Sequence, residues 1–219
     1  MGGIVKYLGR LLRRRPKISV LEGGRRPVEA EIRRVRKLGA GTEGEVREIE
    51  VTLKSGKRSR TITLAEKKFF KLNRGATAIF GKAYKNPEVQ VRIYKKLREL
   101  NSSKNLGIRI PTTFRLKRNG KKISIVLTKL LIPKSRDLVT EMITSRQWDI
   151  VFGGMEKEFG IDKADAKNDY FYDRNRQISK LEQNGYWANA VHSFMPAYDP
   201  KSGKAIAVLV DFGEVSGAI

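Results

Sequence analysis

A change to a two-residue period between residues 32 and 70 limits the possible folds more than any other feature of this sequence. In this segment apolar residues alternate with polar ones on both sides of the break Lys54-Ser55-Gly56-Lys57, which has the residues of a turn. The alternating apolar residues are Ile49, Val51, Leu53, Ile62 and Leu64. Successive side chains of a strand point to opposite faces, so the pattern predicts a β-hairpin with one buried face.

Other segments predict further strands and helices. Asn86-Pro87-Glu88 has the capping residue, the first-turn proline and the early acid of a helix start, and apolar residues at helical spacing extend this helix to Leu100. A second hairpin is expected at residues 112–127, with its turn at Arg118-Asn119-Gly120. The remaining predicted elements are helices within 138–160 and 174–188 and a buried strand at 205–210.

Charge is distributed unevenly along the chain. The 219 residues carry 46 Lys and Arg against 23 Asp and Glu, a formal net charge of +23. Residues 1–136 hold 37 of these cations and 10 of the anions, whereas residues 137–219 hold 9 and 13. The change falls in a proline-bearing polar stretch that has the composition of a linker. The expected parts are a basic arm at 1–31, an N-terminal lobe at 32–131, a linker at 132–137 and a C-terminal lobe at 138–219.

The composition excludes several classes of protein and site. The chain has no cysteine, which excludes disulfides, thiolate metal sites and cysteine nucleophiles. No apolar run approaches the ~18 residues of a membrane-spanning helix, so no transmembrane segment is expected. The first residues lack the apolar core of a secretory signal, which together with the missing cysteine favours a cytoplasmic protein. Delivery into a host cell as an effector stays open as an alternative.

A glycine-rich motif precedes the alternating segment. The stretch Leu38-Gly39-Ala40-Gly41-Thr42-Glu43-Gly44-Glu45-Val46 contains the pattern G-x-G-x-x-G-x-V. Glycine has no Cβ, so the backbone of such a turn can approach phosphate groups closely. A dinucleotide-binding fingerprint would continue into a helix, whereas the two-residue period after Val46 predicts a strand.

Two further motifs follow in the chain. In Leu64-Ala65-Glu66-Lys67 the two-residue period places Ala65 and Lys67 on one face of the strand. Asp211-Phe212-Gly213 follows the apolar strand predicted at 205–210. Together with the glycine motif, these segments resemble the protein kinase family, in which a glycine-rich loop, a strand lysine and D-F-G occur in this order.

This resemblance implies an ATP site with Mg²⁺. Lys67 would pair with the α- and β-phosphates, Asp211 would bind Mg²⁺, and Ala65 would lie under the adenine. The backbone of Thr128 and Leu130, at the end of a strand similar to the family's fifth, would contact the adenine ring. The phosphates would be cradled by the glycine-motif residues Gly39, Ala40, Gly41, Thr42, Gly44 and Val46.

In the family an acid on the next helix holds the strand lysine, and here two residues are candidates for this role. Glu88 is the candidate by position in the chain. Gln90 fits the inward face of the helix better, because Tyr94 and Leu97 follow it at helical spacing, whereas polar residues follow Glu88. A neutral amide would hold Lys67 less firmly than a carboxylate, and both candidates stay open.

The resemblance also implies the fold class. It predicts a bilobal α+β fold, kinase-like, with a β-rich N-lobe and a reduced helical C-lobe. Residues 36–131 and 205–213 match the family's order of motifs well, and residues 138–204 match it poorly. The chain continues for only six residues after Gly213, so the expected C-lobe lacks an activation segment and the later helices.

The family's catalytic base has no counterpart at its usual position. The H-R-D-x-x-x-x-N loop would correspond to residues 185–195, yet no carboxylate lies between Glu182 and Asp199, and Asp199 has the surroundings of a turn residue. His192, the sole histidine, could accept a hydroxyl proton near neutral pH, and its alternative is a buried structural role. Asp173 is a further candidate from elsewhere in the chain.

These observations favour an ATP-dependent phosphotransferase, a small atypical protein kinase acting on a Ser or Thr hydroxyl of a protein substrate. A catalytically inactive pseudokinase scaffold that still binds nucleotide is the alternative that the missing base supports. A third alternative is a binder of nucleic acid or of an anionic membrane surface, because the net +27 of residues 1–136 attracts phosphate polymers without sequence specificity.

Overall fold

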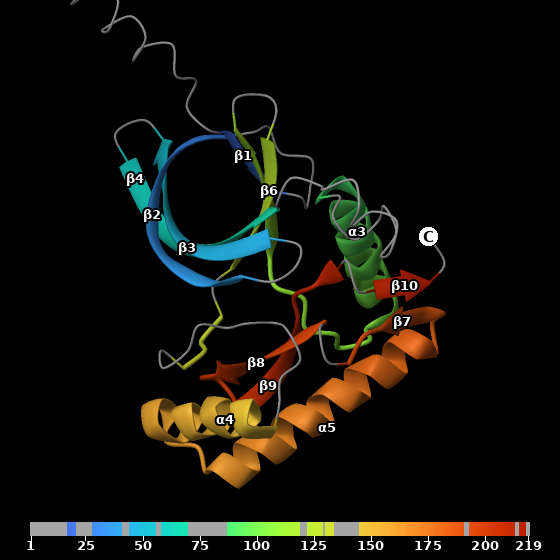
Figure 1. Cartoon of the computed structure of the whole chain (residues 1–219). Coiled ribbons are helices and arrows are strands. Elements are labelled where there is room, and N and C mark those ends of the chain that lie inside the picture. The colour runs from blue at the N-terminus through green and yellow to red at the C-terminus, as the bar shows by residue number, and fades with distance from the viewer. Residues whose placement is uncertain are drawn as a thin grey trace, which may run out of the picture.

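The fold places a β-barrel above a layer of helices and hairpins (Figure 1). The computed structural model describes residues 17–20, 28–40, 44–55, 58–69, 87–118, 122–128, 130–133, 145–190, 193–212 and 215–217. The chain is mixed α+β over these residues, which confirms the α+β part of the predicted fold class. No helix in these ranges is both long enough and apolar enough to span a membrane.

The barrel is built from strands of the N-terminal part, in the spatial order β1-β2-β3-β4-β6-β5. Every neighbouring pair is antiparallel, and β1 closes the barrel by pairing with both β2 and β5. The strands are β1 (Lys17–Val20), β2 (Val28–Ala40), β3 (Gly44–Ser55), β4 (Arg58–Phe69), β5 (Thr113–Arg118) and β6 (Lys122–Thr128).

The barrel confirms both predicted hairpins and corrects one boundary. β3 pairs with β4 and β5 with β6, as alternation and turn residues indicated. The predicted arm at 1–31 is wrong at its C-terminal end, because Lys17–Val20 and the first residues of β2 belong to the barrel. A four-residue strand is too short to show a period, and pairing with β5 decides its place.

The other elements lie beside and below the barrel. In Figure 1, α3 stands next to it, the β8–β9 hairpin lies beneath it, and α4 and α5 form the lowest layer. β7 and β10 form a separate two-stranded sheet. The elements are α3 (Pro87–Lys104), α4 (Ser145–Phe159), α5 (Lys163–Glu182), β7 (Tyr186–Ala188), β8 (Phe194–Asp199), β9 (Lys204–Leu209) and β10 (Val215–Gly217).

The helices differ from the predicted ranges in informative ways. α3 begins at Pro87, as the helix-start residues predict, and continues four residues past the predicted end at Leu100. α5 begins at Lys163, far before the predicted start at residue 174. The Asp162 side chain accepts hydrogen bonds from the backbone N–H groups of Ala164 and Asp165, at 2.8 and 3.0 Å, and so caps this earlier start.

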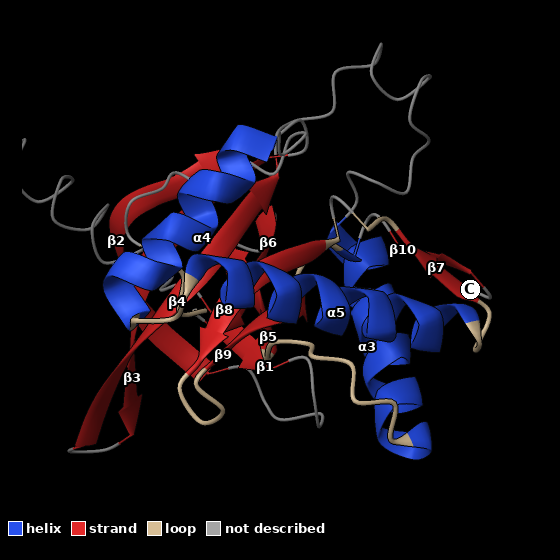
Figure 2. Ribbon diagram, turned by 90° about the horizontal axis from the view of Figure 1, so that it is seen from below, coloured by secondary structure: helices blue, strands red, loops and turns tan. Residues whose placement is uncertain are grey.

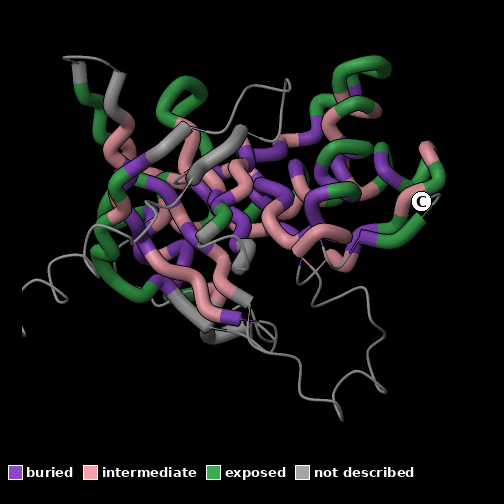
Figure 3. The backbone as a smooth tube through the Cα atoms, turned by 90° about the horizontal axis from the view of Figure 1, so that it is seen from above, coloured by how far each residue is buried: buried purple, intermediate pink, exposed green. Residues whose placement is uncertain are grey.

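Two separate apolar cores hold these parts together. The first fills the barrel and includes Ile49, Val51 and Leu64. The second joins the inward face of α3 to α4, α5 and the strands β7 to β10. The helices α4 and α5 run across one side of the molecule (Figure 2), and the buried residues are concentrated toward its middle (Figure 3). α3 therefore packs with the C-terminal elements although it stands beside the barrel.

Candidate functional site

The ends of β2, β3 and β4 bring the glycine motif beside Lys67. Gly39 on β2 lies opposite Val46 on β3, and Val46 in turn lies opposite Lys67 on β4. The described ends of the glycine motif, Gly39 and Val46, are therefore neighbours of the lysine in one sheet. The motif residues that the structure describes are Gly39, Ala40, Gly44 and Val46, whereas Gly41 and Thr42 lie outside the described residues.

Lys67 forms an ion pair with Asp211. The Lys67 Nζ lies 2.9 Å from the Asp211 Oδ2, although 144 residues separate the two along the chain. The side chains are 13% and 17% exposed, so water screens their attraction much less than it screens a surface pair. Ala65 lies two residues before Lys67 on β4 and faces the same way, while Leu64 and Glu66 are buried on the other face.

Contacts of Asp211 itself and of the residues on either side of it hold Asp211 in place. The N–H groups of Val210 and Asp211 donate to the Ser193 carbonyl, at 2.9 and 3.3 Å. Phe212 is buried in the second core, where its ring meets the Tyr94 ring of α3 edge-to-face with centroids 5.3 Å apart. α3 therefore packs directly against the residue that follows Asp211.

A short loop between β7 and β8 supplies the carbonyl that anchors Asp211. The Ser193 N–H donates to the Asn189 carbonyl at 2.9 Å, which closes the loop, and Ser193 is fully buried. Arg174 of α5 reaches this loop and donates to the Ala190 carbonyl at 3.4 Å. His192 lies outside the described residues, so its predicted role as a base stays a prediction.

The two candidates on α3 are placed differently from each other. Glu88 forms an ion pair with Arg115 of β5, and no ion pair joins it to Lys67 in the part of the chain that the structure describes. The ion pair that the structure gives Glu88 joins it to β5, and its expected role as the acid that holds Lys67 stays a prediction. Gln90 is 1% exposed and lies on the inward face, as the helical spacing indicated.

The segment predicted to contact adenine is engaged in protein contacts. The Thr128 N–H donates to the Thr112 carbonyl at 2.9 Å, so this N–H is engaged within the protein, and the adenine contact expected of the Thr128 and Leu130 backbone stays a prediction. Leu130 follows the end of β6 and is partly buried, and the next carbonyl, that of Leu131, accepts from the Tyr198 N–H at 2.7 Å. Residues 134–137 of the predicted linker lie outside the described residues.

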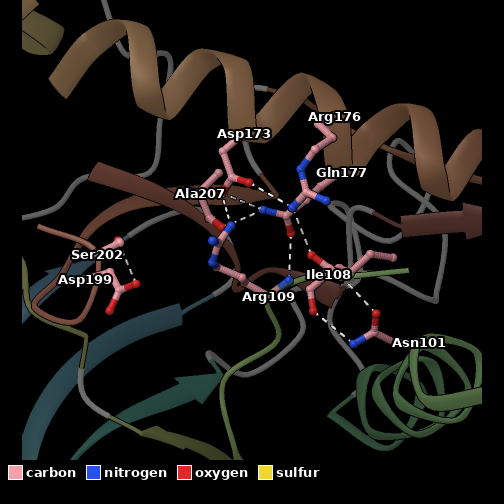
Figure 4. Close-up of polar contacts among 10 residues, drawn as sticks. Asn101, Ile108, Arg109, Asp173, Arg176, Gln177, Asp199, Ser202 and Ala207 are labelled. Atoms are coloured by element: carbon pink, nitrogen blue, oxygen red, sulfur yellow. Dashed lines mark hydrogen bonds and ion pairs between the residues drawn. The ribbon is translucent and has the colours of Figure 1, made fainter. Parts of the chain in front are cut away.

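Asp173 lies in a network away from Lys67. Figure 4 shows its carboxylate accepting hydrogen bonds from Arg109, Arg176, Gln177 and the Ala207 N–H. These contacts join α5 to β9 and to the segment before β5. The suggestion that Asp173 reaches the site is therefore not supported by its position. Asp199 accepts hydrogen bonds within its own turn, as predicted.

The sequence analysis did not identify the charged residues that lie on the face of the sheet opposite to Lys67. Glu45, inside the glycine motif, accepts hydrogen bonds from Arg47 at 2.8 Å and Lys68 at 3.2 Å. The Arg47 hydrogen bond holds the pKa of the Glu45 carboxyl below its ordinary value. The two-residue period places Glu45 and Lys68 on the face opposite to Val46 and Lys67, and this signal was present in the sequence.

The site has one carboxylate suited to a divalent cation. Asp211 provides it, and the described residues contain no group of three or more His, Asp or Glu that could hold a metal without other ligands. A magnesium ion here would need oxygens from a bound phosphate chain, which is how Mg²⁺ is usually held in nucleotide sites. A cavity of about 510 Å³ is lined by barrel residues that include Ile62, Phe114 and Thr128, and by neither member of the ion pair.

The described residues thus bring three features together: the strand ends of the glycine motif, the Lys67 ammonium, which water screens only weakly, and the Asp211 carboxylate, which is far from Lys67 in the sequence. No protein-family model matches the chain, and no curated protein matches its sequence.

Proposed function

We propose that this chain is an ATP-dependent phosphotransferase with a bilobal, protein kinase-like fold, acting on a protein Ser or Thr hydroxyl. The observation that supports this most is the 2.9 Å ion pair between Lys67 and Asp211 beside the glycine hairpin. Local sequence cannot bring together two residues 144 positions apart. The resemblance to the protein kinase family requires that Lys67 and Asp211 lie close together.

The residues would act mainly by positioning. The backbone of the glycine hairpin and the Lys67 ammonium would bind the phosphates, and the Asp211 carboxylate would hold Mg²⁺. Mg²⁺ would neutralise charge on the phosphate oxygens during transfer. Phosphoryl transfer needs little covalent help from the protein, so a weak base such as His192 suffices in this proposal.

Nucleotide binding tests this proposal directly. We expect wild type to bind ATP with Mg²⁺ in calorimetry, and Lys67→Met and Asp211→Asn to bind at least about tenfold more weakly, a loss of about 1.4 kcal/mol. Lys204→Met and Asp169→Asn are matched controls, because they make the same chemical changes at an exposed ion pair. Absence of binding by wild type at millimolar ATP and Mg²⁺ would refute the proposal.

A nucleotide-binding pseudokinase is the second candidate. It is favoured by the loop that follows β7, which has no carboxylate and closes on itself through the Ser193–Asn189 hydrogen bond. Transfer of labelled γ-phosphate to acceptor proteins separates the two candidates. Binding without transfer indicates the pseudokinase, and transfer that is lost in His192→Ala but not in Asp173→Asn supports the kinase with an imidazole base.

The basic N-terminal half suggests an additional anionic partner. Arg34 and Lys37 of β2 are exposed and form no ion pair with the described part of the chain. We propose that this surface attracts nucleic acid or an anionic membrane. Binding that falls steeply as salt rises would indicate attraction without sequence specificity.

A further inference from the structure

Glu45 occupies an unusual position for a charged residue. It lies between Gly44 and Val46 at the start of β3, and its side chain is only 13% exposed. A partly buried carboxylate is costly unless cations and hydrogen-bond donors compensate it. Arg47 and Lys68 provide both, through contacts of 2.8 and 3.2 Å.

The contact with Lys68 ties the start of β3 to β4, whereas Arg47 compensates the carboxylate from within β3. Glu45 lies directly opposite Lys68, in the same way that Val46 lies opposite Lys67. Neighbouring residues of a strand face opposite ways, so the two lysines emerge on opposite sides of the sheet. On one side Lys67 binds Asp211, and on the other side Lys68 binds Glu45.

The inner side of the sheet has further polar contacts at this end. Arg47 lies opposite Glu66, a carboxylate that is 1% exposed and accepts a 2.8 Å hydrogen bond from the Ser124 hydroxyl of β6. Farther along the same face the side chains are apolar, as at Ile49 and Leu64. The polar group is therefore confined to the end of the barrel that carries the glycine motif.

We propose that Glu45 is a positioning residue that clamps the β3 side of the glycine hairpin to β4 before nucleotide binds. The clamp holds the first residues of β3, Gly44 to Val46, beside Lys67, so that phosphate binding does not have to order them. A binding site ordered in advance binds more tightly, since less conformational entropy is lost on binding. The effect on nucleotide affinity rests on the proposed function, whereas the clamp itself does not.

Amide hydrogen exchange of the full chain measures the clamp without nucleotide. We expect amides in and around the hairpin, at residues 39–47, to exchange about tenfold faster in Glu45→Gln, because local opening no longer has to break the charge-assisted hydrogen bonds of the carboxylate. Lys68→Gln should act in the same direction but less strongly, because Glu45 keeps its contact with Arg47. The double variant should exchange no faster than Glu45→Gln, because that variant already removes the contact with Lys68.

The matched control is Glu50→Gln. Glu50 lies on the same strand and also pairs with an arginine, but its partner Arg33 is 74% exposed. Exposed pairs contribute little, so this variant should leave hairpin exchange unchanged. Hairpin exchange in Glu45→Gln that equals exchange in Glu50→Gln would overturn the clamp, as would additive effects in the double variant.

Nucleotide affinity then tests the consequence. Glu45→Gln and Lys68→Gln change the net charge in opposite directions, so a simple charge effect on ATP binding would have opposite signs in the two variants. The clamp predicts weaker binding of ATP with Mg²⁺ in both, by about three- to tenfold. Opposite shifts would overturn this consequence. If wild type binds no nucleotide, the proposed function fails, and the exchange experiment still decides whether the clamp exists.

Discussion

Replacing Asp173 should destabilise the fold without acting on the chemistry of the candidate site. Asp173 belongs to the buried face of α5, and the residue is 8% exposed. Its Oδ2 accepts from the Ala207 N–H and the Gln177 amide, each at 3.0 Å, and also from Arg109. Its Oδ1 accepts from Arg176 at 3.0 Å.

The magnitude follows from what each donor loses in Asp173→Ala. The Ala207 N–H is buried and keeps no acceptor there, which costs about 1–3 kcal/mol. The Gln177 amide keeps its 2.8 Å bond to the Ala207 carbonyl, so its loss is nearer ~1 kcal/mol. Arg109 and Arg176 are each more than a third exposed and can turn to water, so together they add at most ~1 kcal/mol. The total is about 3 kcal/mol.

Thermal and urea unfolding measure this loss. For a chain of this size, about 3 kcal/mol corresponds to a fall in Tm of roughly 6–12 °C. Asp169→Ala is the matched control, because Asp169 lies one turn earlier on α5 and pairs with Lys204, which is 62% exposed. We expect this control to lose less than ~1 kcal/mol.

Two results would refute the reasoning about Asp173. One is a loss below ~1 kcal/mol in Asp173→Ala, which would mean that water replaces the carboxylate at little cost. The other is an Asp173→Asn variant that folds with wild-type stability and binds ATP normally but transfers no phosphate. That result would make Asp173 the missing base and would contradict its position in the network.

Three further predictions concern glycines and pH. Gly153→Ala should stabilise the fold by about 0.5–1 kcal/mol, because a Cβ at this position in α4 meets no atom within 4 Å and alanine favours helix. Gly217→Ala should disrupt the β7–β10 pair and lower the Tm, because its φ is +143° and a Cβ would lie 2.4 Å from the Gly185 carbonyl oxygen. The pKa of Glu45 is lowered by the hydrogen bond from Arg47, so the native state binds fewer protons than the unfolded state. Its stabilisation is therefore complete above about pH 4.5 and disappears as the pH falls through the lowered native value. Wild type should therefore lose more stability than Glu45→Gln as the pH is lowered from neutral to below 4.5 in urea unfolding. Equal losses in the two proteins would contradict this assignment.

Much of the fold could be predicted because its signals are local. The β3–β4 hairpin followed from alternation, and the start of α3 at Pro87 followed from its capping residues. α5 was placed too late, because its first half is mostly polar and its buried residues, such as Ala166 and Tyr170, are few. The buried residues of α5 do recur at helical spacing, but Asp173 and Gln177 among them are polar, so an apolar period alone does not reveal the helix and packing against α4 and β9 decides it.

The sequence by itself determined the glycine turn, the strand period that turns Lys67 and Lys68 to opposite faces, and the apolar strand before Asp211. These features depend on residues within a few positions of one another. Only the tertiary structure decided which charges meet: Lys67 with Asp211, Glu88 with Arg115, and Asp173 with Arg109. A chain with 46 cations and 23 anions offers many possible ion pairs, and the partner of each is chosen by distance in space, which packing of the barrel against the helices sets.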